Sequence, residues 1–402
     1  MDQKPVSYLA LKSLLGHMEA NKRIQTVIAC PSLRKVEKTI PLRIDHLAFM
    51  SDYEVKINNN LYSFGVIRQY REGPPPEEIQ SANGRGGLRC DLDESGYERP
   101  SYRLTKTTGD ICFGDGLDDD DEFGIWLEGR IPAHNKIDLN PAYDCFVQLN
   151  LTTGGFGQPS RPVQKIPYEK KLHEVMKEFM TFIFGGRTCP VQVNCLEIYS
   201  TTQIIRLPVG VKFSVHELGV PTRISSVSEV LRPILDESCF PIKHINQRAS
   251  IELNDPFVAS AEEVTFEDHR DGSLFDVIRN LPHFKVNIFN CSRFNEEEFI
   301  EFLEYLLESD KKPGTTYQLA YDNERKYKNQ EIASTFLRID AGIMKREVII
   351  DFLDFIIQKW NSLKERVRTT YDKDVKLMYF GRIKSYSVLK IQVLGNRQAT
   401  NE

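Results

Sequence analysis

The acidic run Asp118–Asp121 is the densest group of potential metal ligands in the sequence. Calcium loops supply several carboxylate and carbonyl oxygens at fixed positions along the chain. A loop that starts at Asp119 places Phe123 at the fifth ligand position and Arg130 where the closing Glu belongs. Because neither side chain can offer an oxygen, we expect a solvated acidic loop and no metal site.

Three glycine clusters raise the question of a phosphate cradle, in which bare backbone amides approach an anion. Gly84–Gly87 is not followed by Lys-Ser or Lys-Thr, and Gly114–Gly116 is surrounded by acids that would repel phosphate. Gly154–Gly157 opens onto Pro159 rather than onto a helix. The clusters therefore predict turns and loops, and no cofactor.

The cysteines and histidines show no catalytic or zinc-binding spacing. Cys189 and Cys195 have five residues between them, without a CxxC or HxxxH element. Several histidines stand beside apolar residues in expected helices or strands: His17, His173, His216 and His244. We interpret them as packed or surface side chains and expect no enzyme, although a triad assembled from distant residues stays open.

Composition describes an ordinary globular protein. The 402 residues are 41% hydrophobic and 27% charged, and the net charge of −5 gives no basic field for nucleic acid. A chain of this length is expected to form two or three folded parts. We find no secretory signal and no membrane-spanning run, so we expect a soluble intracellular protein, cytoplasmic or nuclear, with reduced cysteines.

The elements that must position these residues fall into three regions. Residues 1–40 predict a small helical head, because apolar residues recur at helical spacing over 7–29 and Asn21 divides them. Residues 41–160 predict a β-rich domain with a hairpin over 40–70, a strand at 145–149 and a disordered acidic insert at about 71–124.

Residues 161–402 predict a body of alternating helices and strands. Helical stripes are expected at 172–184, 227–235, 274–279, 299–307 and 348–360, and strands at 193–199, 242–245, 284–289, 316–321 and 375–380. Such alternation indicates parallel strands with helical crossovers, or a horseshoe-like stack similar to leucine-rich repeats. The fold class is therefore mixed α+β.

The segment from Cys30 to Ile44 carries a family resemblance. It reads CPSLRKVEKTIPLRI, follows a leucine-rich helix and precedes Tyr62–Val66. With these flanks, residues 4–150 resemble a nematode-restricted family of mostly uncharacterised proteins, some of them labelled F-box C proteins. Separately, Val264–Tyr321 is similar to the F-box-associated region of nematode F-box proteins.

The resemblance implies a role for the head. An F-box binds the adaptor subunit of a cullin-type ubiquitin ligase while the rest of its chain captures a substrate protein. Adaptor-binding residues would then be Leu11, Leu14, Leu15, Met18, Val27 and Cys30. The expected function is a non-catalytic substrate receptor whose partners are proteins, with no nucleic acid and no membrane.

Two departures from the F-box pattern keep an alternative open. The head has no Leu-Pro opening, and Pro31-Ser32-Leu33 stands where many F-boxes have a tryptophan. The alternative is a stand-alone intracellular interaction or structural protein with a vestigial F-box. An enzyme of unrecognised type is a third reading.

Overall fold

The computed structural model forms two compact units. One contains residues 1–219 and 223–240, and the other contains residues 220–222 and 241–402. The structure describes residues 7–92, 98–99, 106–113, 142–154, 160–199, 204–220, 227–247, 255–267, 281–283, 285–289, 305, 315–322, 374–383 and 386–394. Within these ranges no helix is long and apolar enough to cross a membrane.

The predicted helical head is confirmed and has more helices than expected. It consists of α1 (Tyr8–His17), α2 (Ala20–Ala29), the 3₁₀ turn η1 (Pro31–Leu33) and α3 (Arg34–Lys38). Ser7 caps α1 by accepting a hydrogen bond from the amide of Ala10, and Glu19 caps α2. The break therefore lies at Met18 and Glu19, and Asn21 is a buried residue inside α2.

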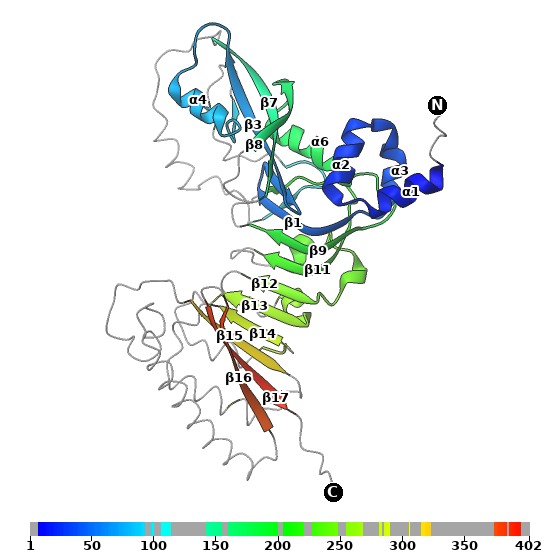
Figure 1. The fold of residues 1–402 in the computed structure, drawn as a ribbon, viewed down its shortest axis with the longest axis vertical. Helices are drawn as coiled ribbons and strands as arrows, with labels where there is room; N and C mark the ends of the chain where they lie inside the picture. The colour runs from blue at the N-terminus through cyan, green and yellow to red at the C-terminus, as the bar shows by residue number, and fades with distance from the viewer. Residues whose placement is uncertain are drawn as a thin grey trace, which may run out of the picture. The chain divides into compact units, whose positions relative to one another are not determined.

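The first unit is built on a mixed sheet (Figure 1). Its strands are β1 (Arg43–Ser51), β2 (Glu54–Ile57), β3 (Asn60–Tyr70), β7 (Tyr143–Thr153), β8 (Ser160–Pro167), β9 (Val191–Ile198) and β11 (Phe213–Val220). They lie in the order β11-β9-β1-β2-β3-β7-β8. The pairs from β1 to β8 are antiparallel, whereas β9 is parallel to both β1 and β11. The expected hairpin over 40–70 is thus a three-stranded meander.

Helix α6 (Leu172–Phe184) covers the sheet and begins and ends where its periodicity predicts. Its apolar face is buried, and the ring of Phe179 lies 5.4 Å from Tyr62 and 5.3 Å from Phe64 on β3. Phe184 meets Phe213 of β11 at 5.4 Å. Residues 161–219 and 223–240, which were expected in the C-terminal body, therefore belong to the first unit, because β8 pairs with β7 and β9 pairs with β1.

The segment expected to be a disordered insert includes regular elements where it is described. They are α4 (Glu77–Gly84), β4 (Asp91–Leu92) paired with β5 (Glu98–Arg99), and β6 (Ile111–Cys112) paired with β10 (Ile204–Ile205). Asn83 fastens α4 to β3 by exchanging two hydrogen bonds with the backbone of Arg68, at 2.8 and 3.1 Å. The acidic run Asp118–Asp121 lies outside the described residues.

The glycines after α4 allow its loop to lie against β3. A Cβ on Gly65 would come within 2.3 Å of the carbonyl oxygen of Gly86. Gly86 and Gly87 have φ of 97° and 96°, which side chains rarely adopt. The predicted turn is confirmed for Gly86 and Gly87, whereas Gly84 is the last residue of α4.

Parallel strands in chain order form the second unit, as the alternating pattern predicts. They are β12 (His244–Gln247), β13 (Glu263–Glu267), β14 (Lys285–Phe289) and β15 (Thr316–Asp322), and β15 pairs antiparallel with β17 (Tyr386–Leu394), which pairs with β16 (Asp374–Ile383). Helix α8 (Pro256–Ser260), capped by Asp255, connects β12 to β13.

One more of the predicted helical stripes falls wholly on described residues. In the first unit, α7 (Val227–Leu231) and the turn η2 (Glu237–Cys239) follow β11, so the stripe expected at 227–235 is helical over its first part. The stripes expected at 274–279 and 348–360 lie outside the described residues, as does the one at 299–307 except for Tyr305. The strand starts at 244, 263, 285 and 316 are unevenly spaced.

Candidate functional site

The six residues expected to bind an adaptor do not share one surface. Leu15 is 0% exposed and Val27 is 3% exposed, so both belong to the interior of the head. Leu14 is 59% exposed, Cys30 is also exposed, and Leu11 and Met18 are half-buried. A partner could touch the last four, whereas Leu15 and Val27 hold the head together.

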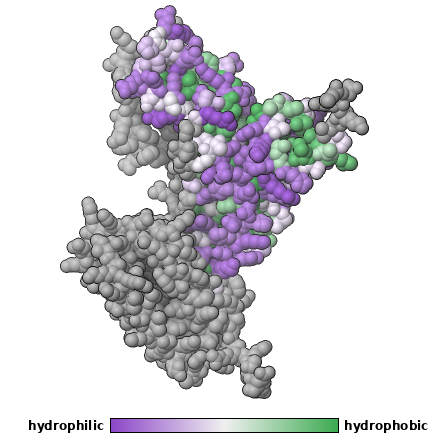
Figure 2. All heavy atoms as spheres, viewed as in Figure 1, coloured by the Kyte–Doolittle hydropathy of each residue, from purple (hydrophilic) through white to green (hydrophobic). Residues whose placement is uncertain are grey.

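In the described residues of the head, four large apolar side chains face solvent, and of these only Leu14 was among the expected adaptor-binding residues. We call Tyr8, Leu9, Leu14 and Ile28 the head patch; their exposed fractions are 55%, 77%, 59% and 38%. Figure 2 shows hydrophobic surface gathered over the head, whereas the neighbouring strands show mainly hydrophilic surface. Leu9 and Ile28 were not among the expected adaptor-binding residues. Leu9 lies outside the apolar stripe of its helix, whereas Ile28 follows Ile24 at helical spacing.

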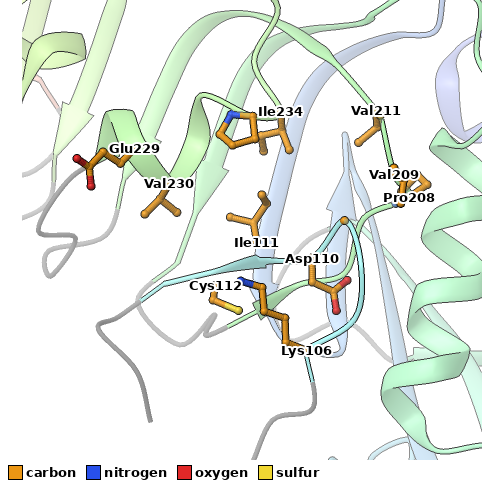
Figure 3. A pocket seen from close by; sticks show the side chains of 13 residues that line it. Lys106, Asp110, Ile111, Cys112, Pro208, Val209, Val211, Glu229, Val230 and Ile234 are labelled. Atoms are coloured by element: carbon orange, nitrogen blue, oxygen red, sulfur yellow. The ribbon is translucent and has the colours of Figure 1, made fainter. Parts of the chain in front are cut away.

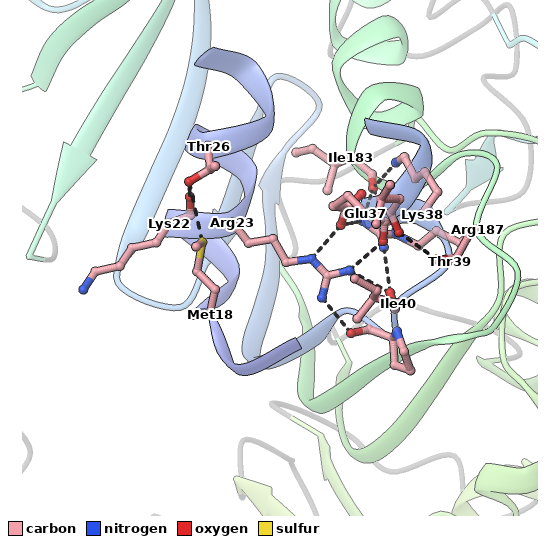
Figure 4. Close-up of polar contacts among 12 residues, drawn as sticks. Met18, Lys22, Arg23, Thr26, Glu37, Lys38, Thr39, Ile40, Ile183 and Arg187 are labelled. Carbon is pink, nitrogen blue, oxygen red and sulfur yellow. Dashed lines mark hydrogen bonds and ion pairs between the residues drawn. The ribbon is translucent and has the colours of Figure 1, made fainter. Parts of the chain in front are cut away.

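A buried cluster of charges anchors the head to α6 (Figure 4). The Glu37 carboxylate of α3 accepts hydrogen bonds from Arg23 of α2 and from Arg187, each at 2.8 Å. The three side chains are 2–5% exposed. Lys38 donates to the carbonyl oxygens of Phe182 and Ile183, at 2.5 and 2.7 Å, at the end of α6.

The cluster sets two guanidinium groups and the amine of Lys38 against one carboxylate, and its electrostatics reflect this excess of basic groups. Burial lowers the pKa of Lys38 to about 7, and the neighbouring Arg187 lowers it further than Glu37 can restore. Burial also lowers the pKa of Arg23, against the attraction of Glu37. The head is therefore held by charged groups that have little access to water.

A second polar network fixes the other side of the head to the sheet. The side-chain amide of Asn21 donates to the carbonyl oxygen of Ile57 at 2.8 Å and accepts from the hydroxyl of Tyr62 at 3.0 Å. Asn58, in the turn between β2 and β3, donates to Glu19 at 2.6 Å. The two networks together fix the position of the head on the first unit.

An apolar groove of about 350 Å³ opens next to the head patch. Ile28 belongs to both, and the groove continues between α2, α6 and the sheet. Its polar lining residues are Gln164 and Glu178, and its apolar lining residues are Val27, Ile28, Pro31, Phe64, Val147, Leu149, Ile166, Val175, Phe179 and Phe182.

A larger cavity of about 430 Å³ lies beside β6 (Figure 3). Asp110 and Cys112 line it from one side, and Val230 and Ile234 from another. Burial would raise the pKa of Asp110, but hydrogen bonds from Lys177 at 2.6 Å, from Thr107, and from Arg206 at 2.7 Å lower it. This carboxylate is a charged anchor, and it is poorly suited to accept a proton.

His46 and His244 each lie against a polar side chain of a neighbouring strand, and Cys195 is half-buried. His46 lies 3.0 Å from the carboxylate of Glu197, and His244 lies 2.7 Å from the hydroxyl of Thr265. Burial and the charges of Glu217 and Glu197 raise the pKa of the Cys195 thiol to about 11, which disfavours a reactive thiolate. Among the residues with a described placement, no three His, Cys, Asp or Glu side chains gather as a metal site would require.

Comparison with known proteins gives one family match. Residues 171–323 match a family model described as a domain of unknown function (DUF3557). The match begins at the residue before α6 and ends just after β15. No curated protein and no solved structure matches the chain.

Proposed function

We propose that the chain is a non-catalytic protein-interaction module that serves as an F-box-like substrate receptor. The head would bind the adaptor subunit of a cullin-type ubiquitin ligase, and the body would capture a substrate protein. The observation that carries the proposal is the head patch, an apolar surface on a head whose inner residues are already packed.

The division of labour between neighbouring leucines supports this proposal. Leu15 is fully buried, whereas Leu14 offers most of its side chain to solvent. Burying a large aliphatic side chain is worth about 1.5–3 kcal/mol, so a partner that covers Leu9 and Leu14 gains a large part of a micromolar affinity. Exposed apolar patches on a folded protein mark interaction sites.

Rigid attachment of the head also favours a receptor. A receptor must hold its substrate at a fixed place relative to the adaptor. Glu37 bonds both to Arg23 of the head and to Arg187 beyond α6, and Asn21 bonds to β2. The head resembles nematode F-box C proteins, and this resemblance suggests the ligase adaptor as the partner of the head.

A stand-alone interaction protein is the second candidate. The same buried contacts also favour this second candidate. They make the head part of the first compact unit, so its helices would contribute to the fold even in a chain that binds no ligase. In that case the head patch would meet a partner other than the adaptor.

A capture experiment with purified adaptor separates the two candidates. The double variant Leu9→Ser/Leu14→Ser should lose capture and keep its melting temperature, because both side chains are exposed. Val163→Ser is the matched control, since Val163 is an exposed apolar residue on β8, outside the head. Failure of the native chain to capture adaptor at micromolar concentration would leave the stand-alone protein as the better proposal.

A further inference from the structure

A polar cavity of about 320 Å³ lies on the first unit, and no residue of the head patch lines it. Two loops form it: residues 185–190 after α6, and residues 209–212 before β11. Its charged lining residues are Arg187 and Lys212, and no carboxylate lines it in the described part of the chain. The lining therefore favours a negatively charged occupant.

The groups behind this cavity add positive charge. Arg187 belongs to the cluster in which Arg23, Lys38 and Arg187 surround the single carboxylate of Glu37 (Figure 4). These side chains are buried, so water screens their field weakly. An anion in the cavity would offset charge that the protein itself leaves unbalanced.

Lys212 can bond an anion directly. Its ammonium donates to the carbonyl oxygens of Pro233 at 2.9 Å and Leu235 at 3.3 Å. A lysine ammonium has three protons, so one donor remains beyond these two bonds. The guanidinium of Arg187 is directed to Glu37 and to the carbonyl oxygen of Ile183, so it contributes charge rather than a direct bond.

The backbone of both loops leaves space for a ligand. Gly186 and Gly210 have φ of 69° and 75°, and an added Cβ on either would meet no atom within 4 Å. These backbone conformations favour glycine, and the space that a Cβ of either residue would enter is open. Val209, which is 71% exposed, also lines this cavity.

We propose that this cavity is a binding site for a small oxyanion of the phosphate class, held by Lys212 and by the excess positive charge behind Arg187. The proposal is independent of adaptor binding. The opposing interpretation is that Lys38, Arg187 and Lys212 only cap carbonyl groups at the ends of local segments.

Inorganic phosphate is the probe, titrated calorimetrically into the full-length protein at low ionic strength. Lys212→Gln should weaken binding about tenfold, because it removes one charged donor. Lys22→Gln makes the same charge change on α2, which contributes no lining residue, and should leave the affinity within about twofold.

A second pair of variants tests the charge of the occupant without touching the charge cluster. Because Val209 also lines the 430 Å³ cavity and Lys212 does not, the Lys212 variant distinguishes the two cavities. Val209→Glu places a carboxylate on an exposed lining position, and Val209→Gln places a neutral group of similar size there. Phosphate should raise the melting temperature of the native protein and of the Gln variant more than matched potassium chloride does, and the Glu variant should lose this difference. Phosphate also stabilises proteins generally, so an equal rise in all the variants, or no heat of binding to the native protein, would overturn the proposal.

Discussion

Leu14 and Leu15 are adjacent in the chain and face opposite environments. Leu15 is enclosed in the head, whereas Leu14 is 59% exposed. Truncating a buried leucine to alanine costs about 2–5 kcal/mol, and an exposed one about 0.5 kcal/mol or less. We expect Leu15→Ala to lower the free energy of unfolding by that larger amount and Leu14→Ala to leave it nearly unchanged, as measured by urea denaturation. Equal losses would contradict the placement of the two side chains.

Lys38 makes stability depend on pH. Its pKa is about 7 in the folded chain, below the ordinary value of 10.5, so above pH 7 the unfolded chain binds more protons than the folded chain. The penalty for burying this amine is greatest below pH 7 and is relieved as the pH rises from 7 toward 10.5. The free energy of unfolding should therefore rise by about 1–3 kcal/mol between pH 7 and 9.

Replacing Lys38 with methionine should remove that rise. Lys171→Met is the control, because the Lys171 ammonium also donates to a backbone carbonyl, that of Leu92 at 2.8 Å. Urea unfolding at pH 7, 8 and 9 gives the three slopes. A native slope that Lys38→Met preserves would refute the role of this amine.

At the scale of elements, the joint between α3 and the end of α6 depends on one carboxylate. Glu37→Gln keeps the shape of the side chain but leaves Arg23 and Arg187 without their anion. Removing one partner of a buried ion pair costs about 3–5 kcal/mol. The exposed pair Lys170–Glu178 supplies the control, since Glu178→Gln should cost about 1 kcal/mol or less. Thermal melting of both variants tests this difference, and similar losses would contradict it.

The loop after α4 provides a separate test of an element. Gly65→Ala would drive a Cβ into the carbonyl oxygen of Gly86, so we expect about 1–3 kcal/mol of destabilisation from the forced shift of the backbone. Gly84→Ala is the matched control, because nothing lies within 4 Å of the added atom and its φ is not in the left-handed region. Denaturation midpoints of the two variants should differ clearly, and a neutral Gly65→Ala would show that the loop is not packed on β3.

The sequence predicts some of these elements better than others. The stripe from Leu172 to Phe184 marks α6 because its apolar residues recur at helical spacing over three turns. Strand β8 was not predicted, since it lies exposed at the edge of the sheet and has Pro162 and Pro167. Its strand character comes from pairing with β7, which local pattern cannot reveal.

The candidate site was predictable only in outline. Helical spacing places Leu14 and Leu15 on one broad apolar stripe, and the packing of the head decides which of them is enclosed. The pairing of Glu37 with Arg187 joins distant parts of the chain, and no spacing rule connects them. Cavities formed by two loops, such as the one at Lys212, are likewise properties of the folded chain.

At the scale of the whole molecule, the first unit has two candidate binding surfaces. We propose that the head patch binds a protein and that the cavity at Lys212 binds an anion. Substituting exposed residues of one surface should abolish binding there and leave the other surface unchanged. The Leu9→Ser/Leu14→Ser variant should therefore bind phosphate like the native chain, and Val209→Glu should still capture the adaptor. Loss of both functions in either variant would show that the surfaces are coupled.

Hydrogen exchange of the full chain, with and without the purified adaptor, tests whether the head binds the adaptor. We expect slower exchange in α1 and at the end of α2, around Ile28, where the adaptor would cover the head patch. Residues of β8 around the exposed Val163 should exchange at the same rate in both samples. Unchanged exchange throughout the head at saturating adaptor, or protection confined to other elements, would contradict adaptor binding by the head.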